Sequence, residues 1–171
     1  MRAKLFAVAA ATTSVLMASH VSAAPAEENA MKVSSKEELT TFAIGNPNDA
    51  YAQYFIGQSY LNPYQTDKSC GVSNVTFEPS CRNNWHIHHK APQILVVVAG
   101  EGIYQEWGKD PVLLKPGMVV NIPPEVKHWH GATADSWMQH LSIAPAIEGA
   151  SNEWLEQVDD AAFAQANTDA K

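Results

Sequence analysis

The sequence predicts an all-β fold, an antiparallel barrel or sandwich with short helices near its two ends. Three observations lead to this fold class. Runs rich in branched and aromatic residues recur between positions 51 and 143, clusters of turn residues separate them at short intervals, and helical patterns are confined to the flanking segments. The 171 residues suit one domain, and 46% hydrophobic against 17% charged residues can fill its core.

The predicted elements follow one another along the chain at short spacing. Ser35 and Glu38 have the spacing of a capping box, which predicts a short helix in the polar N-terminal segment. The stretch 51–61 has strand character, and Asn62-Pro63 ends it. The further strands that we predict are 72–77, 85–89, 93–99, 102–107, 112–114, 118–122, 127–130 and 137–143.

The C-terminal segment has a helical pattern from Ser151 onward. Trp154 and Val158 are four residues apart and Phe163 lies beyond them, so we expect one or two short helical turns that pack on the barrel, followed by loose final residues. We therefore divide the chain into a signal peptide at 1–23, an N-terminal extension at 24–44, the barrel at 45–148 and a C-terminal helical tail at 149–171.

The first residues have the pattern of a secretory signal peptide. Arg2 and Lys4 give a positive start, an apolar run follows, and Val21-Ser22-Ala23 and Ser22-Ala23-Ala24 are both small-residue cleavage patterns. The run is shorter than the ~20 residues that a membrane-spanning helix needs, so an uncleaved anchor is the less favoured alternative. We expect a soluble mature protein that is periplasmic or secreted in a bacterium.

The charge of the chain excludes some classes of partner. Lys and Arg number 11 against 18 Asp and Glu, a formal charge of −7. Loss of Arg2 and Lys4 with the leader leaves 9 basic against 18 acidic residues, about −9. Nucleic acid and anionic membrane surfaces both require a basic surface, so neither is an expected partner of the mature protein. A small-molecule substrate is therefore the partner that we expect.

Two cysteines, Cys70 and Cys81, are permitted to form a disulfide in an oxidising compartment. The segment between them is predicted as a strand, and eleven extended residues span roughly 36 Å. A disulfide needs Cα atoms within ~7 Å. Unless a turn intervenes, we expect both cysteines to stay unpaired or to pair elsewhere.

Six histidines lie in one β-rich stretch, after His20 is set aside with the leader. Side chains of a strand alternate between its faces, so His86 and His88 point one way and His89 the other. His128 and His130 likewise share a face. Two imidazoles from one strand and a third from another can converge on one ion. Histidines that are merely exposed or hydrogen-bonded, without a metal, are the alternative.

The histidine runs resemble the two motifs of the cupin superfamily. The segment from Ser80 to Gly100, which contains His86-Ile87-His88 and Gln93, resembles the first motif, Gly-x5-His-x-His-x3,4-Glu-x6-Gly. The segment from Gly117 to His128 resembles the second, Gly-x5-Pro-x-Gly-x2-His. The chain is most similar to small bacterial single-domain cupins of the carboxymuconolactone-decarboxylase-associated group, which includes manganese-dependent hydroxynitrile lyases. The resemblance covers about residues 45–145.

This resemblance implies a fold, a metal site and an assembly. The fold is an antiparallel double-stranded β-helix, the jelly-roll barrel of cupins. The implied ligands of one divalent transition metal are His86, His88, Gln93 and His128, with manganese first and iron, zinc or nickel as alternatives. One or two coordination positions stay open for water or substrate. A homodimer is expected by analogy with other small cupins.

The chain departs from the family pattern at four places, one of which is Ala132, where many cupins have Asn. Ser80 and Glu125 replace glycines at turns. Gln93 replaces the usual glutamate ligand, which leaves the site about one positive charge higher. A more positive site makes the metal a stronger Lewis acid and disfavours its oxidised state. Lewis-acid or acid–base chemistry is therefore favoured over oxygen activation.

Two further histidines are candidates for proton transfer. His130 shares a face with His128, and the resemblance places His140 on a strand beside the pocket, where Met138 and Ser142 also line it. The alternative is that they only orient ligands or line the pocket. His89 is expected at the surface, and Trp85 and Trp129 are expected to pack outside the barrel or at a dimer contact.

Three functions remain open. The first is an exported metal-dependent enzyme, a lyase, isomerase or hydratase, in which His130 or His140 moves a proton. The second is an oxygenase that uses iron or manganese at the same site. The third is a non-catalytic cupin that binds a small ligand or metal.

Overall fold

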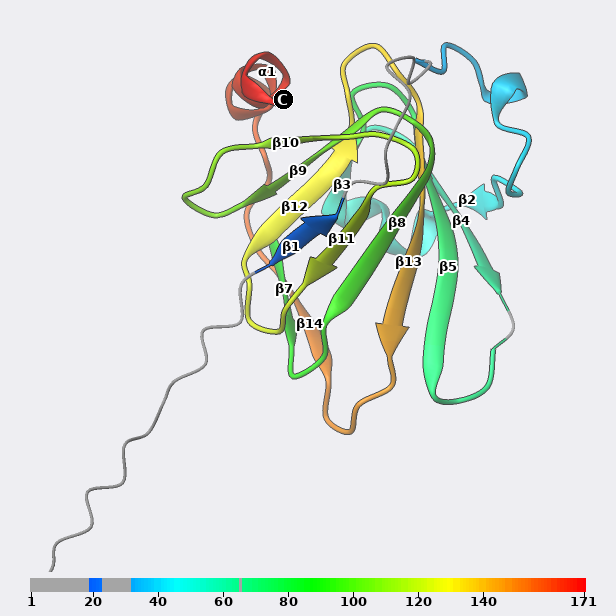
Figure 1. The fold of residues 1–171 in the computed structure, drawn as a ribbon, viewed down its shortest axis with the longest axis vertical. Coiled ribbons are helices and arrows are strands. Elements are labelled where there is room, and N and C mark those ends of the chain that lie inside the picture. Colours follow the sequence, from blue (N-terminus) through cyan, green and yellow to red (C-terminus); the bar gives the residue numbers. More distant parts are fainter. Residues whose placement is uncertain (1–18, 23–31, 65) are drawn as a thin grey trace, which may run out of the picture.

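Two antiparallel sheets curl into a barrel in the computed structural model, which describes residues 19–22, 32–64 and 66–171 (Figure 1). One sheet has the order β1 (His20–Ser22), β11 (Val119–Ile122), β8 (Gln93–Gly100), β13 (Met138–Pro145), β5 (Cys70–Phe77), β4 (Ser59–Tyr64) and β2 (Asn46–Pro47). The other has the order β10 (Val112–Leu114), β9 (Gly102–Glu106), β12 (His128–Ala132), β6 (Arg82–Asn83) and β3 (Phe55–Ile56). The strand β7 (His86–His89) joins this second sheet by pairing with both β12 and β14 (Ser151–Trp154).

Three short helices flank the strands: η1 (Lys36–Glu38), η2 (Asp49–Tyr54) and α1 (Asp160–Asp169). The predicted all-β fold, an antiparallel double-stranded β-helix with short terminal helices, is confirmed. In η1 the Glu38 carboxylate accepts the backbone N–H of Ser35 at 3.1 Å, as a capping box requires. None of the helices in the described residues is long and apolar enough to cross a membrane.

The core lies between the sheets because alternate residues of each strand point inward. In β8, Gln93, Leu95 and Val97 are buried while the residues between them are half-exposed. The buried cluster comprises Val75, Phe77, Cys81, Leu95, Val97, Tyr104, Leu114, Val120, Ile122, Ala132 and Met138. The polar Gln93 therefore points into an otherwise apolar interior, and it does so beside the histidines.

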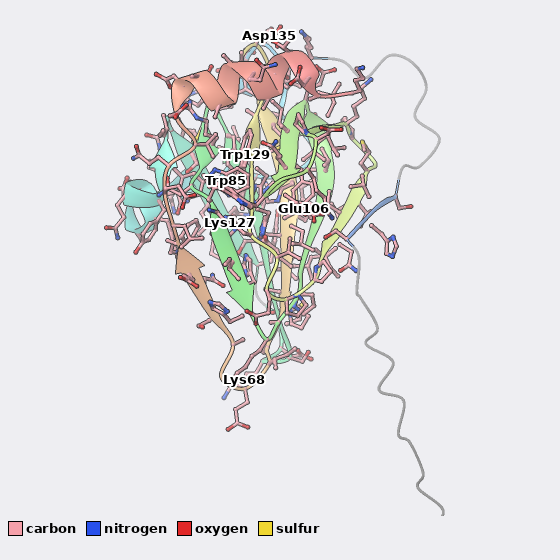
Figure 2. All side chains as sticks on the ribbon, turned by 90° about the vertical axis from the view of Figure 1, so that its left-hand side faces the viewer. Lys68, Trp85, Glu106, Lys127, Trp129 and Asp135 are labelled. Atoms are coloured by element: carbon pink, nitrogen blue, oxygen red, sulfur yellow. The ribbon has the colours of Figure 1, made fainter. Side chains whose placement is uncertain are left out.

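A second apolar cluster lies outside the barrel, beneath α1. Trp85 and Trp129 lie on the outer face of their sheet, near Lys127 (Figure 2). The Trp129 ring is 6.2 Å from Phe163 of α1, centroid to centroid. The predicted outward packing of the two tryptophans is thus confirmed, and α1 covers them.

The segment 51–61 differs from the prediction of a strand that ends at Asn62-Pro63. Its first part is the 3-10 helix η2, and the following strand β4 continues through Pro63. Pro63 is tolerated because β2 pairs with β4 only at Tyr60 and Leu61, so no partner strand needs a proline N–H on that side.

The predicted helical tail at 149–171 is wrong in its first part. Ser151–Trp154 forms β14, which pairs with β7, and the helix begins only at Asp160. The predicted loose final residues are also wrong, because the last residue is hydrogen-bonded to the barrel: Lys171 O accepts the backbone N–H of Leu113.

The predicted signal peptide falls largely outside the described residues, and its cleavage remains a prediction. Its described residues include β1, which adds a strand to the edge of the sheet beside β11. Within the described part of the chain, Cys70 and Cys81 are both free thiols, and they lie on different segments of the barrel. Burial raises the pKa of the Cys81 thiol to about 12.

Candidate metal centre

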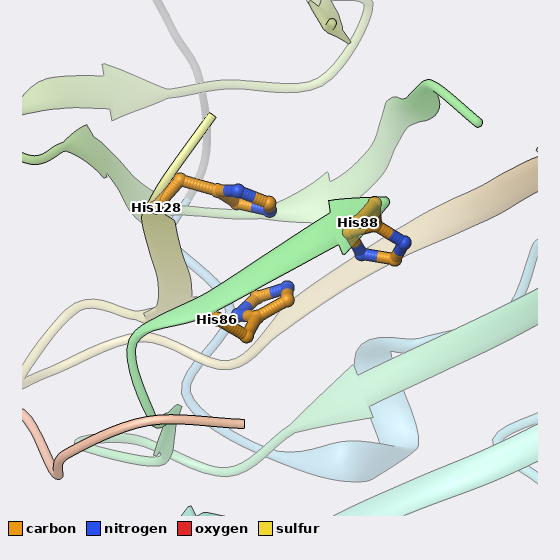
Figure 3. Close-up of side chains that lie close together, drawn as sticks. All are labelled: His86, His88 and His128. Carbon is orange, nitrogen blue, oxygen red and sulfur yellow. The ribbon is translucent and has the colours of Figure 1, made fainter. Parts of the chain in front are cut away.

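Three histidines from two neighbouring strands point toward one another. His86 and His88 are alternate residues of β7, so both face the interior, and β12 places His128 directly opposite His86. Figure 3 shows the three rings converging. One ligand nitrogen from each residue lies within 4.8 Å of the other two, and all three side chains are buried.

Hydrogen bonds to the backbone orient two of these rings. His86 Nδ1 lies 3.0 Å from the Asn84 carbonyl oxygen, and His128 Nδ1 lies 2.9 Å from that of Val126. A proton on each Nδ1 leaves the Nε2 lone pair free to bind a metal. His88 Nε2 is buried and has no hydrogen-bond partner among the described residues. Since buried polar atoms are normally satisfied, this unpaired nitrogen fits a missing metal ion.

Gln93 supplies a fourth donor from the opposite sheet. Its Nε2 donates to Ser142 Oγ at 3.1 Å, which turns the amide so that Oε1 lies 3.2 Å from His128 Nε2. The oxygen of Gln93 therefore faces the histidines. The four side chains His86, His88, Gln93 and His128 form a cluster of neutral donors, which we call the metal centre.

Burial keeps the three histidines unprotonated. Desolvation holds the pKa of His86 well below its ordinary value, and the neighbouring His128 and His88 rings add to the shift. Burial also lowers the pKa of His88, and it lowers the pKa of His128 to about 4. At neutral pH all three imidazoles are therefore in the form that binds a metal without first losing a proton.

His130 and His140 form a second buried pair next to the metal centre. Their ring centroids are 4.9 Å apart, and His130 lies 5.6 Å from His86. Asn83 holds His130, because its amide nitrogen lies 3.1 Å from His130 Nε2 and its oxygen accepts the His130 backbone N–H. Both nitrogens of His140 are buried without a partner in the described structure. Burial lowers the pKa of both rings, that of His140 to about 4.

A cavity of about 290 Å³ opens onto both groups of histidines. His86, His88, Gln93, His130 and His140 line it, whereas His128 is fully buried and is not among the lining residues. Its other walls are mainly apolar and aromatic, and include Tyr51, Phe55, Leu61, Val75, Phe77 and Trp154. Ser142 lines the cavity as predicted, whereas Met138 belongs to the buried core cluster and does not line it. The arrangement can bind a small molecule with an apolar part beside a metal ion.

His89 points away from the metal centre, as the strand alternation requires. Its Nδ1 contacts a Glu125 carboxylate oxygen at 2.6 Å and its Nε2 a Glu153 oxygen at 2.9 Å. These carboxylates raise the pKa of His89.

Several cavity residues were not found from the sequence. Asn83 could have been found from the sequence, because it is a polar residue inside a β-rich run, three positions before His86. Tyr51 and Phe55 lie in a segment that was predicted as one strand, and Trp154 and Asn152 in one predicted as helix. No local pattern indicates that these segments face the histidines, because tertiary pairing brings them there.

Comparisons with known proteins agree with this geometry. The Cupin domain family matches residues 73–144. The chain is similar to an (R)-mandelonitrile lyase from Granulicella tundricola, with 38% identity over 112 residues that span 64% of this chain and 85% of that protein. It is also similar to an acireductone dioxygenase from Bacillus pumilus, with 30% identity over 66 residues, 36% of this chain and 38% of that protein.

A solved structure gives the same result at the level of the fold. The crystal structure of a cupin-like protein from Thermotoga maritima has a TM-score of 0.68 and 37% sequence identity, and the match covers 74% of this chain and 96% of that one. The family match at residues 73–144 contains both histidine motifs.

Proposed function

Because this chain belongs to the cupin superfamily, we propose that it is an exported enzyme of the lyase type that uses one divalent metal ion, manganese first, on a small organic substrate. The observation that carries the proposal is the convergence of His86, His88, His128 and Gln93 Oε1 beside an apolar cavity. When bound there, the ion supplies Lewis-acid polarisation of a substrate oxygen.

Four neutral donors favour this chemistry over oxygen activation. The ligand set carries no negative charge, because a glutamine stands where the family pattern has glutamate. The full charge of the ion therefore acts on the substrate. The same set disfavours a higher oxidation state of the metal, which oxygen activation uses.

His130 and His140 are the groups that move protons in this proposal. Both are unprotonated at neutral pH and both face the cavity. His140 has two unpaired nitrogens, and Asn83 holds the ring of His130 in place. One ring accepts a proton from the substrate, and the pair returns it to the leaving group. The Phe77 ring, 5.8 Å from His130 and 5.6 Å from His140, keeps bulk water away from the pair.

The substrate class that we favour is a hydroxynitrile with an aromatic or bulky apolar group. The similarity to an (R)-mandelonitrile lyase supports this choice, as do the aromatic walls formed by Phe55, Phe77 and Trp154. In the cleavage, the bond between the hydroxyl carbon and the nitrile carbon breaks, a carbonyl forms, and hydrogen cyanide leaves with the proton that the hydroxyl released.

The first test is the metal content of the mature protein, purified without an affinity tag, beside His86→Ala and His88→Ala. We expect about one manganese or iron ion per chain in the wild type, measured by mass spectrometry, and its loss in both variants. Wild-type protein that holds no metal above the level of these variants, even after reloading, would rule out the metalloenzyme.

The second test separates metal binding from proton transfer. We expect His130→Ala and His140→Ala to retain the metal and to lose about 10²-fold or more in kcat for hydroxynitrile cleavage, because general acid–base catalysis contributes at least that much. Unchanged turnover in both variants on every accepted substrate would show that neither ring moves the proton.

An oxygenase is the second candidate, and the similarity to an acireductone dioxygenase is the observation that favours it. This chain spans 38% of the length of that relative, so the support comes from a minor part of each protein. Oxygen uptake by the iron-loaded protein with a phenolic or enediol substrate would establish this alternative, and cyanide release without oxygen uptake would exclude it.

A further inference from the structure

The strand β14 lies against the strand that carries two of the metal-centre residues. It is antiparallel to β7 and pairs Asn152 with His88 and Trp154 with His86. Directly opposed residues of neighbouring strands project to the same face, so both side chains point toward the metal centre. Both also line the cavity. β14 lies outside residues 73–144, the region that matches the Cupin domain family.

β7 depends on β14 for its position. On its inner side, β12 pairs with β7 at a single position, His128 with His86. On its outer side, β14 pairs with all four residues of β7. The ladder continues past the strand, because Leu155 N–H donates to the Trp85 carbonyl at 2.8 Å and Trp85 N–H donates to that of Glu156 at 3.0 Å.

The Trp154 indole contacts the ring of His86 directly. The two rings are stacked, with centroids 4.8 Å apart and planes 28° apart. Trp154 is itself fixed by Tyr54 of η2, whose ring stacks on it at 4.6 Å and 6°. The Asn84 carbonyl fixes one edge of His86 through Nδ1, and Trp154 fixes a face of the same ring. Together these contacts determine where His86 Nε2 points.

Asn152 has the corresponding place beside His88. It lies directly opposite His88 in the ladder of β7 and β14, and its side chain lines the cavity together with those of His88 and Gln93. His88 has no backbone carbonyl partner of the kind that orients His86 and His128 among the described residues. Its orientation therefore depends on these two side chains.

We propose that Trp154 and Asn152 are positioning residues for the metal centre, Trp154 by fixing the plane of His86 and Asn152 by orienting His88. The proposal rests on the metal binding of the proposed function. It assigns to the C-terminal segment a role in holding the ion, and it makes the stack of Tyr54 and Trp154 a contact between η2 and β14. Loss of such orienting partners commonly weakens metal affinity by about 10- to 100-fold.

The test measures the Mn²⁺ dissociation constant by competition with a fluorescent chelator, together with the thermal midpoint of the metal-free protein. The variants are Trp154→Ala, Trp154→Phe and Asn152→Ala, all in the full mature chain. Trp107→Ala is the matched control, because Trp107 is 60% exposed and contacts Lys127 and Trp85 rather than the metal centre.

We expect Trp154→Ala to bind Mn²⁺ about tenfold more weakly than the wild type and Trp154→Phe to recover most of that loss, because phenylalanine restores a stacking face. Asn152 is exposed at its outer side, so Asn152→Ala should fold normally and still lose several-fold in affinity. Trp107→Ala should bind as the wild type does.

Each outcome decides between the two proposals. Wild-type affinity in both Trp154→Ala and Asn152→Ala would overturn the positioning role while leaving the metal centre intact. An equal loss in Trp107→Ala would show a general effect of removing a tryptophan and would also overturn it. If the wild type itself binds no Mn²⁺, the proposed function fails first. If Trp154→Ala does not fold, Trp154→Phe and Asn152→Ala still decide the question.

Discussion

At the scale of single residues, the two departures from the family's glycines occur where the backbone is left-handed. Ser80 has φ 68° and Glu125 has φ 67°, a conformation that costs a residue with a Cβ about 1–2 kcal/mol. Glu125 offsets this cost, because its carboxylate accepts the Lys90 backbone N–H at 3.0 Å and contacts His89. Ser80 has only a distant contact from its hydroxyl, 3.4 Å from the Ala134 carbonyl.

Ser80→Gly is therefore expected to raise the free energy of unfolding by about 1 kcal/mol, since glycine adopts this conformation without steric cost. Glu125→Gly should gain less or lose stability, because it removes the contacts with Lys90 and His89. Urea unfolding of the two variants and the wild type measures the difference. No gain at Ser80 would show that the local strain is small.

The buried histidines make the stability of the metal-free protein depend on pH. Burial lowers the pKa of His128 and of His140 to about 4, whereas in the unfolded chain a histidine titrates near pH 6.5. Between these values the unfolded chain binds protons that the folded protein does not. The free energy of unfolding should therefore fall as pH falls from 6.5 toward 4, by about 1.4 kcal/mol per pH unit for each histidine.

Urea unfolding of the metal-free protein at pH 7, 5.5 and 4.5 measures this dependence. His140→Leu removes one of the buried titrating histidines and should make the slope shallower. A free energy of unfolding that stays constant from pH 7 to 4.5 would contradict the expected protonation of the unfolded chain.

At the scale of elements, periodicity identified strands that have one buried face. The segment 112–114 was predicted with the bounds that β10 has, and most others came within two residues. Ser151–Trp154 carries no such signal, because three polar residues and one tryptophan show neither alternation nor an apolar run. Its strand conformation comes from pairing with β7, which only the folded chain provides.

The attachment of α1 depends on one buried side chain. Arg82 is 3% exposed, donates to the Val158 and Ser80 carbonyls, contacts Asp160 at 2.6 Å and lies 4.4 Å from the centre of the Phe163 ring. Arg82→Met should cost about 2–3 kcal/mol of unfolding free energy, because it leaves buried carbonyls without donors.

The matched control is Asp160→Asn, since the Asp160 carboxylate is 95% exposed and should contribute under about 1 kcal/mol. Denaturant unfolding compares the two variants. Equal losses would show that the ion pair, rather than the hydrogen bonds and the packing of the guanidinium, attaches the helix.

At the scale of the whole molecule, the sequence identified the residues that could bind a metal but not the cavity that surrounds them. His86, His88 and His128 could be found because strand alternation and motif spacing are local properties. Trp154 and Tyr54 are 100 positions apart in the sequence, and their contact depends on the closure of the barrel. The predicted homodimer stays a prediction, to be tested by light scattering.

Export is also a property of the whole chain, and we predict it from the first residues. The intact mass of protein recovered from the bacterial periplasm should correspond to a chain that begins at Ala24 or Pro25, after one of the two cleavage patterns. A mass that includes Met1, with the protein held in the membrane fraction, would instead establish an uncleaved anchor.

The strand β1 has a consequence for the order of events during secretion. His20–Ser22 is paired with β11 and contains Val21 and Ser22, the first residues of the two predicted cleavage patterns. A precursor that folded before transport would hold the peptide bonds near the cleavage site against a sheet edge, where a peptidase could not bind them in extended form. The predicted transport and cleavage must then be faster than folding. Removal of β1 by the predicted cleavage would leave the β11 edge without its neighbour, free to pair with another strand.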